Sequence, residues 1–591
     1  MKRRDFLKVS LTAGVATALP INVFGHTANS DNDAHQNGDK PDLSGAADIL
    51  ILGNIITVDE NKLFADAMTI KNGYVQYVGN EQKARKLSDS HTVEKKYPKG
   101  LTIYPGFMEA HCHGMSVGLL ESTIKLFDCN SFSEYQKTIK DYIAKHPGQD
   151  VYRISGWRNI GGQLPTAKLL DEVTPEGVCI LGGSMDGHCF WVNSNCLKLI
   201  DETDPHFYDK YTPLEVPKDS NGRPTGYFSE SAASDIQKLI PISMDTAKNS
   251  ILAWQQFAFK HGLVAATEAG VNLASKFADA YSQLAKEGKL QFRTRAYWNV
   301  VMDQANEETV AMVERMSKEQ NNEYYKVVGL KIFIDGVVES HTALLTKAYE
   351  DKKDTYGLDR YKDATGDPDA TLKKLVLTAH QHGLPTHTHT IGDGAVKKML
   401  DAIEYAKSTT GDYSIRDMLA HIELIRTQDI KRFAQLNVSA IVSALWSPKN
   451  AITPFGEELG YLGERATTNY QVMNSFVKMG VNCAQHSDYP VSQAFGIPRA
   501  IYCGITRRLP GGGKDTERLA EEAVTRLEML KELTINVAKL WKEENHMGSL
   551  TPGKMANYVV YDCDFIDDDV EKIPGAVVQE VVVDGKEVYH V

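Results

Sequence analysis

Several short apolar runs of this chain, each typical of a β-strand, end in a polar side chain that can bind a metal ion. These side chains lie between positions 111 and 488: His111, His113, Lys331, His387 or His389, His421 and Asp488. In a parallel (β/α)₈ barrel the C-terminal strand ends meet at one mouth, where active sites lie. Imidazoles and carboxylates gathered there bind divalent metal ions and activate water. The pattern therefore predicts a hydrolytic metal site at the mouth of a barrel.

The first two histidines form an HxH pair. His111 and His113 are two residues apart, so on a strand both point to the same face. An isolated HxH is a weak signal, because two core histidines are commoner than two ligands. This pair follows Pro105-Gly106-Phe107 and opens the predicted barrel, which favours the interpretation as ligands.

Lys331 lies inside the apolar strand that runs from Val327 to Asp335. Burying an ammonium group is unfavourable unless it is paired or neutralised. One interpretation is a salt bridge with Asp335, which is four residues away on the same face. The interpretation that we favour is carbamylation by CO₂, which turns the amine into an anionic ligand able to bridge two metal ions.

The remaining polar pairs leave a choice of ligand. His387 and His389 share one strand face, and either suits the ligand of the fifth strand. His486 and Asp488 also share a face; we expect Asp488 to be the ligand and proton shuttle, with His486 beside it. His380 and His382 fall in a helical pattern, so we expect them at the surface.

The elements that must position these residues alternate between strands and helices, which indicates a parallel α/β architecture. Residues 117–250 are too many for one strand-to-helix connection and predict an inserted subdomain at the barrel mouth. The expected fold is thus a (β/α)₈ TIM-like barrel over 107–547, with the insertion after its first strand. Eight candidate strands end near His113, Glu268, Asn299, Asp335, His389, Glu423, Ser443 and Asp488.

Short strand patterns separated by Gly, Asn and Asp occur at both ends of the chain, over 46–106 and 548–591. Each group alone is too small to be stable. We therefore expect the two groups to pair into one small β-sandwich domain.

The N-terminus reads as a targeting segment, with residues 1–30 as a signal peptide and 31–45 as a polar linker. Arg3-Arg4 followed by Phe6-Leu7-Lys8 resembles a twin-arginine export signal; a Sec signal or a membrane anchor is the alternative. The apolar run is shorter than the roughly 20 residues of a membrane span. We expect a bacterial periplasmic protein, carried by the twin-arginine export machinery, with no stable membrane span.

The net charge and the cysteine content limit the classes of partner that we expect and the redox state of the thiols. The net charge is -12, and the first eight residues carry +3, so the rest carries -15. Such a surface does not suit nucleic acid. The eight cysteines of the 591 residues form no CxxC pair. Folding in a reducing cytoplasm before export predicts mostly free thiols. We expect a small-molecule substrate, and the sequence is compatible with a homo-oligomer.

In combination these motifs resemble the amidohydrolase superfamily, and within it the YtcJ-like group, amidohydrolase family 3. The resemblance covers residues 46–591 and rests on PGFMEAHCH, GLKIFIDG, HTIGDGAV, SDYPVS and the closing segment from Leu533 to Asp562. Glu109 stands where the family usually has Asp. Ser443-Ala444-Leu445-Trp446 stands where Gln-Pro is expected.

The resemblance implies a site and an activity. It selects His389 over His387 and implies six metal ligands: His111, His113, Lys331, His389, His421 and Asp488. It implies two divalent ions, expected to be zinc, bridged by a Lys331 carbamate and a hydroxide. Asp488 would be the catalytic proton shuttle, and we expect His188, Trp446 and His486 in the substrate pocket.

The expected activity is hydrolysis of a non-peptide carbon–nitrogen bond in an N-substituted amide or formamide. A metal-dependent lyase or decarboxylase on the same scaffold is one alternative, because fold and metal do not fix the reaction. A non-enzymatic regulatory or binding protein is the other.

Overall fold

The computed structural model describes residues 41–184, 189–229, 232–233, 235–236, 242–271, 276–319, 321–491 and 495–591. Its centre is a sheet of eight strands in the order β18-β17-β16-β15-β14-β13-β12-β6, in which every hydrogen-bonded pair is parallel. This confirms the predicted barrel. The strands are β6 (Phe107–Cys112), β12 (Leu263–Val271), β13 (Arg293–Val300), β14 (Tyr325–Phe333), β15 (Thr386–Thr390), β16 (Asp417–His421), β17 (Val438–Val442) and β18 (Cys483–Gln485).

The chain after β18 closes the barrel onto β6 at the C-terminal mouth. The amide of Asp488 donates to the carbonyl of His111 at 3.1 Å, and that of His113 donates to the carbonyl of Tyr489 at 3.0 Å. The amide of Ser487 donates to Glu109 Oε1 at 2.9 Å. These bonds place Asp488 beside the first two histidines.

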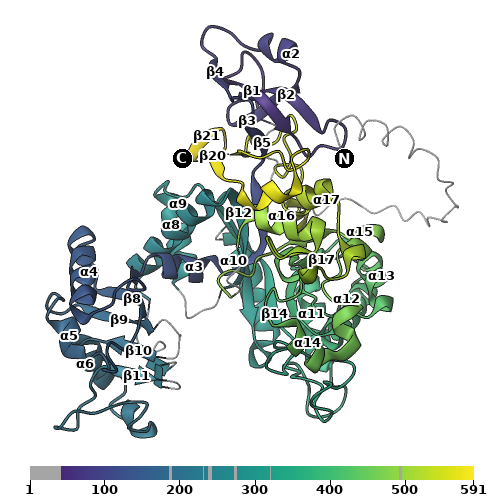
Figure 1. Cartoon of the computed structure of the whole chain (residues 1–591). Coiled ribbons are helices and arrows are strands. Elements are labelled where there is room, and N and C mark those ends of the chain that lie inside the picture. The colour runs from purple at the N-terminus through teal and green to yellow at the C-terminus, as the bar shows by residue number, and fades with distance from the viewer. Residues whose placement is uncertain are drawn as a thin grey trace.

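Helices follow most of the barrel strands and pack on the outside of the sheet (Figure 1). In α12, apolar residues such as Val396, Met399, Leu400 and Ile403 recur at helical spacing and are buried, and the helix ends at Gly411, whose φ of 73° suits glycine. The barrel helices are α8 (Met244–Lys260), α9 (Phe277–Lys286), α10 (Glu307–Glu319), α11 (Ala370–Gln381), α12 (Asp393–Thr410), α13 (Thr427–Gln435), α14 (Phe455–Leu462), α15 (Asn474–Lys478), α16 (Ile497–Thr506), α17 (Arg526–Glu532) and α18 (Ile535–Leu540).

The expectation that His380 lies at the surface is wrong. His380 is near the end of α11 and is buried, and its Nε2 lies 3.1 Å from Asp417 Oδ1 at the start of β16. The helix turns this residue toward the sheet, where a carboxylate satisfies it. His382, at the helix end, is partly exposed and lies against Glu314 and Glu307.

Strands from both ends of the chain share one sheet, as predicted. Its order is β21-β20-β19-β5-β1-β2-β3, with β4 pairing β1. The junction is β19 against β5, antiparallel, with Tyr558 opposite Pro105. The strands are β1 (Ile49–Ile56), β2 (Phe64–Lys71), β3 (Tyr74–Gly79), β4 (Val93–Lys96), β5 (Thr102–Pro105), β19 (Tyr558–Tyr561), β20 (Val578–Val583) and β21 (Lys586–His590), and the short helix α2 (Glu81–Arg85) follows β3.

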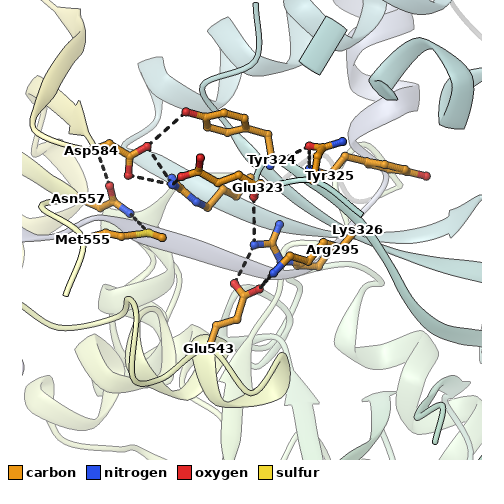
Figure 2. Close-up of polar contacts among 11 residues, drawn as sticks. Arg295, Glu323, Tyr324, Tyr325, Lys326, Glu543, Met555, Asn557 and Asp584 are labelled. Atoms are coloured by element: carbon orange, nitrogen blue, oxygen red, sulfur yellow. Dashed lines mark hydrogen bonds and ion pairs between the residues drawn. The ribbon is translucent and has the colours of Figure 1, made fainter. Parts of the chain in front are cut away.

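Ion pairs join this sheet to the N-terminal ends of the barrel strands (Figure 2). The guanidinium of Arg293, at the start of β13, lies 2.9 Å from Asp584 in the turn between β20 and β21. In the same region, Arg295 makes two hydrogen bonds, at 2.9 and 2.8 Å, to Glu543, which lies outside the sheet in the segment after α18, and Lys326 Nζ lies 2.8 Å from the same carboxylate. The sheet is therefore tied to the end of the barrel opposite the mouth.

A separate five-stranded sheet lies between β6 and β12 in the sequence, in the order β11-β10-β9-β8-β7. Figure 1 shows it projecting sideways from the barrel, with α3 (Gly114–Glu121) and α8 at the connection. None of the helices described is long and apolar enough to cross a bilayer. The elements of this insertion are β7 (Ile124–Lys125), α4 (Phe132–Lys145), β8 (Val151–Trp157), α5 (Ala167–Asp171), β9 (Cys179–Ser184), β10 (Cys189–Val192), α6 (Ser194–Thr203) and β11 (Tyr227–Ser229).

Candidate metal centre

His111, His113 and Asp488 converge at the barrel mouth. The Nε2 atoms of His111 and His113 lie 3.1 and 3.2 Å from the same oxygen, Asp488 Oδ1. One ligand atom from each of the three residues falls within 4.8 Å of the others. Such convergence of two imidazole nitrogens and a carboxylate oxygen is typical of a divalent metal site.

His421 closes β16 with a φ of 78°, a left-handed backbone that is uncommon for a residue with a side chain. Its ring centroid lies 4.7 Å from that of His111 and 4.6 Å from that of His389. No hydrogen bond satisfies its buried Nδ1 within the described chain. The strained turn brings an unpaired imidazole nitrogen into the ring of histidines.

His389 is held by Asp335. Its Nδ1 lies 3.0 Å from Asp335 Oδ1, and the same buried carboxylate accepts from the amides of Leu344, Ile391 and Gly392 at 2.9, 3.1 and 2.8 Å. A carboxylate on one ring nitrogen fixes the tautomer and leaves the other nitrogen free to bind metal.

Lys331 lies fully buried on β14. Its Nζ forms no hydrogen bond or ion pair in the described part of the chain and sits 4.6 Å from the centre of the Phe333 ring. Asp335 is occupied elsewhere, so the salt-bridge interpretation does not describe the structure. Burial lowers the pKa of Lys331 to about 7, and the charge of Asp488 opposes this only in part. Near pH 7 the neutral and protonated forms of the amine are therefore present in comparable amounts.

His387 occupies a deeper position than His389. Its Nε2 lies 2.7 Å from Nδ1 of His111, and its ring packs edge-on against Tyr297. The contact with His111 occupies one ring nitrogen of His387, and the other, Nδ1, is buried without a hydrogen-bond partner among the described residues. The arrangement therefore suits His389 as the ligand and His387 as the residue that orients His111.

Two of the expected substrate residues lie against the ring of histidines. Trp446 stacks on His421 with ring centroids 5.4 Å apart and 9° between the planes, and its buried Nε1 has no hydrogen-bond partner in the described chain. His486 packs 4.9 Å from His421, and burial lowers the pKa of its imidazole to about 4. The third, His188, lies outside the described residues.

Two buried carboxylates that the sequence reasoning did not assign to the site also lie at its edge. Glu109 accepts from the amides of His111 and Ser487, at 3.3 and 2.9 Å, and burial raises its pKa to about 8. Glu268, in the C-terminal half of β12, accepts from the amide of Met115 at 2.9 Å, while its other oxygen is buried without a hydrogen-bond partner in the described chain. Glu268 could have been assigned to the site from the sequence, because it is a charged residue near the end of an apolar strand. The sequence analysis used it only to mark the end of that strand.

The donor set fits a divalent metal ion. Burial holds the pKa values of His111, His387 and His421 well below their usual range, so these imidazoles are neutral and keep a lone pair. The acceptor Asp488 Oδ1 and the nitrogen His421 Nδ1 have no hydrogen-bond partner among the described residues. Buried polar atoms without a protein hydrogen-bond partner indicate that a bound ion or ligand satisfies them.

The sequence model of the amidohydrolase family matches residues 99–589. Three relatives align along most of their length. "Protein LONG AFTER FAR-RED 3" of Arabidopsis thaliana is 27% identical over 93% of both chains. "Putative amidohydrolase YtcJ" of Bacillus subtilis is 23% identical over 91% of this chain and 98% of its own. "N-substituted formamide deformylase" of Arthrobacter pascens is 24% identical over 88% and 94%.

The fold also resembles a solved structure, that of an uncharacterized metal-dependent hydrolase from Pyrococcus horikoshii. The TM-score is 0.66 at 22% identity, covering 88% of this chain and 99% of that one. At this identity the likeness bears on the fold, and it agrees with the barrel described above.

Proposed function

Because the chain belongs to the amidohydrolase family and is therefore a hydrolase, we propose that it cleaves a non-peptide carbon–nitrogen bond in a small molecule. An N-substituted amide or formamide is the proposed substrate class, which the similarity to the formamide deformylase supports. The observation that carries the proposal is the convergence of His111 and His113 on Asp488 at the barrel mouth, at 3.1 and 3.2 Å.

In this proposal the site holds two divalent ions, with zinc as the proposed metal. The ligands are His111, His113, His389, His421, Asp488 and a carbamate on Lys331. When bound, the ions supply an activated water and polarise the carbonyl group that is attacked. The buried, neutral imidazoles of His111 and His421, and the approach of two imidazole nitrogens to Asp488 Oδ1, support this assignment.

The carbamate would form by attack of the neutral Lys331 amine on CO₂. A nitrogen–carbon bond forms, the amine proton passes to water, and the product is an anion with two oxygens. The pKa of about 7 supplies the neutral amine near physiological pH. The absence of a hydrogen-bonding partner for Nζ in the described chain leaves it free to react.

Asp488 is the proposed proton carrier. The contacts of its carboxylate with the proposed ligands His111 and His113, at 3.1 and 3.2 Å, support this role. The carboxylate would take a proton from the attacking water and deliver it to the leaving nitrogen, which a group within hydrogen-bond reach of both can do. Trp446 and His486 would line the substrate pocket, where the unpaired Trp446 Nε1 can donate to a substrate oxygen.

Hydrolysis of aryl formamides with and without a chelator tests the proposal. We expect activity that chelation abolishes and added zinc restores. Oxygen-18 from labelled water should enter the acid product, which separates hydrolysis from the lyase or decarboxylase alternative. Metal-dependent turnover in which the products contain no oxygen-18 from water would favour the lyase or decarboxylase. A pure, metal-loaded protein that turns over no member of an amide, cyclic urea and lactam panel would favour a regulatory role.

We also propose that the protein is exported to the bacterial periplasm by the twin-arginine machinery. The paired Arg3-Arg4 and the following Phe6-Leu7-Lys8 support this. A protein exported folded would carry its metal across the membrane.

A further inference from the structure

Two thiols meet inside the inserted subdomain, far along the chain from the proposed metal ligands. Cys179 is the first residue of β9, and Cys196 lies in the first turn of α6. Both belong to one apolar cluster, which includes Leu181, Val192 and Ile200. Because the start of α6 packs on the start of β9 in this cluster, the two thiols are neighbours.

The surrounding backbone holds the two cysteines together. Cys196 Sγ lies 3.3 Å from the carbonyl of Ile180, the residue after Cys179. Asn193 accepts from the amides of Ile180 and Cys196, both at 3.1 Å, and donates to the carbonyl of Val178 at 2.8 Å. The Asn193 side chain therefore links the start of α6 to Val178 and Ile180, the two residues that flank Cys179.

The two thiols differ in access and in acidity. Cys179 is 8% exposed and Cys196 is fully buried. The hydrogen bond from Cys196 lowers the pKa of Cys179, while the same contact and burial raise that of Cys196. Since the thiolate is the nucleophile in disulfide exchange, Cys179 is the residue that would react first with an oxidant from solution.

We propose that Cys179 and Cys196 form a redox-active dithiol that closes to an intramolecular disulfide with a small-molecule disulfide such as oxidised glutathione. In the first step the Cys179 sulfur attacks the oxidant, a mixed disulfide forms, and one small thiol leaves with the Cys179 proton. Cys196 then attacks the Cys179 sulfur and releases the second small thiol. Two cysteines are oxidised by two electrons and one small disulfide is reduced to two thiols.

The other partly exposed cysteines have different neighbours. Cys129 Sγ lies 3.5 Å from Thr138 Oγ1, and Cys189 Sγ lies 3.0 Å from Tyr227 Oη. Neither contact offers a second sulfur, so oxidation there would stop at a mixed disulfide. The bond between Cys179 and Cys196 would close a ring through β9, β10 and the start of α6, and would restrain the unfolded subdomain.

The full-length protein carrying Cys129→Ser and Cys189→Ser provides the test, because the two partly exposed thiols are removed and the proposed pair is untouched. The folded, reduced protein is incubated with oxidised glutathione, then denatured and alkylated with iodoacetamide. We expect two thiols protected from alkylation, no retained glutathione, and one cross-linked peptide joining Cys179 to Cys196. The oxidised form should melt at a higher temperature than the reduced form.

Single variants in the same background test the order of the steps. Cys196→Ala should retain one glutathione on Cys179, and Cys179→Ala should retain none. Full alkylation of Cys179 and Cys196 after oxidation, or a cross-link between other cysteines, would overturn the proposal. The mass readout does not depend on activity, so its outcome is independent of the proposed hydrolase reaction.

Discussion

The carboxylate of Asp335 holds the imidazole of His389 through a 3.0 Å contact between Oδ1 and Nδ1. Asp335 is itself fixed by three backbone amides, from Leu344, Ile391 and Gly392. The loop after β14 and the turn after β15 are thereby both tied to one carboxylate. The free Nε2 of His389 is left for a metal ion, so the geometry of the proposed ligand depends on a residue that does not bind metal.

Asp335→Asn should weaken metal binding without unfolding the protein. The amide keeps the size of the side chain but can no longer anchor the imidazole as an anion, and loss of such a partner typically lowers metal affinity about 10–100-fold. Competition with a chelating dye measures the affinity. Asp393→Asn is the matched control, because its carboxylate binds Thr346 instead of a histidine. Equal metal affinity in Asp335→Asn and the unmodified protein would show that Asp335 does not orient His389 for metal binding.

Lys331 should carry CO₂ in the metal-loaded enzyme. The amine must be neutral to react, and its pKa is lowered to about 7. At a fixed concentration of dissolved CO₂, the rate at which CO₂-free, metal-free enzyme regains activity with zinc should therefore rise as pH increases through about 7 and level off above it.

Carbon-13 NMR with labelled bicarbonate should show one carbamate signal that disappears in Lys331→Ala and persists in Lys326→Ala. Lys331→Ala should lose metal, and short carboxylic acids should restore part of its activity. An unmodified Lys331 in a fully active, metal-loaded enzyme would contradict this prediction.

Glu532 should make stability depend on pH. This residue of α17 is fully buried and accepts from Gln485 Nε2 at 2.5 Å, and burial raises its pKa from 4.5 to about 8. The native state therefore keeps a proton that the unfolded state releases, so stability falls as pH rises from about 4.5 to about 8. The slope for one such group is up to about 1.4 kcal/mol per pH unit.

Glu532→Gln should remove this component of the pH dependence, because the amide does not titrate. Its melting temperature should match that of the unmodified protein near pH 5 and exceed it increasingly toward pH 8. Glu202→Gln, at an exposed position of α6 far from Glu532 in the chain, is the control and should follow the unmodified protein. A melting-temperature difference that stays constant over this pH range would show that Glu532 is not protonated in the fold.

Export should depend on the arginine pair at the N-terminus. Replacing both Arg3 and Arg4 with Lys should keep the mature protein in the cytoplasm, because the twin-arginine machinery reads these two residues. Fractionation and immunoblotting of the native host measure this. Arg85→Lys, an exposed arginine of the folded chain, is the control. Normal export of the double variant would contradict the assignment.

The sequence alone predicted those features that depend on strand ends. His111, Lys331, His421 and Asp488 each close or interrupt an apolar run, and a parallel barrel brings such positions to one mouth. Pairing of the two chain ends could be predicted for the same kind of reason, since neither group of strands is stable alone.

Contacts that depend on loop paths could not be predicted. The bond between Asp335 and His389 requires two connections to meet, and no periodicity encodes that meeting. The position of His380, by contrast, follows from helical spacing, because this residue lies four residues after the buried Val376, on the face that α11 turns toward Asp417 at the start of β16. The two thiols of the insertion, Cys179 and Cys196, became neighbours only through the packing of α6 on β9.

The central claim is that Asp488 transfers a proton while the histidines gather the metal, and one comparison tests it most directly. Metal content and kcat on an aryl formamide are measured for Asp488→Asn and His421→Ala, under conditions where the chemical step limits the rate. We predict that Asp488→Asn keeps near-normal metal and loses at least about a hundredfold in kcat, while His421→Ala loses metal and activity together. A kcat for Asp488→Asn within about threefold of the unmodified enzyme, against the usual acid–base contribution of about 10²–10⁴, would contradict the claim and move the role to His486.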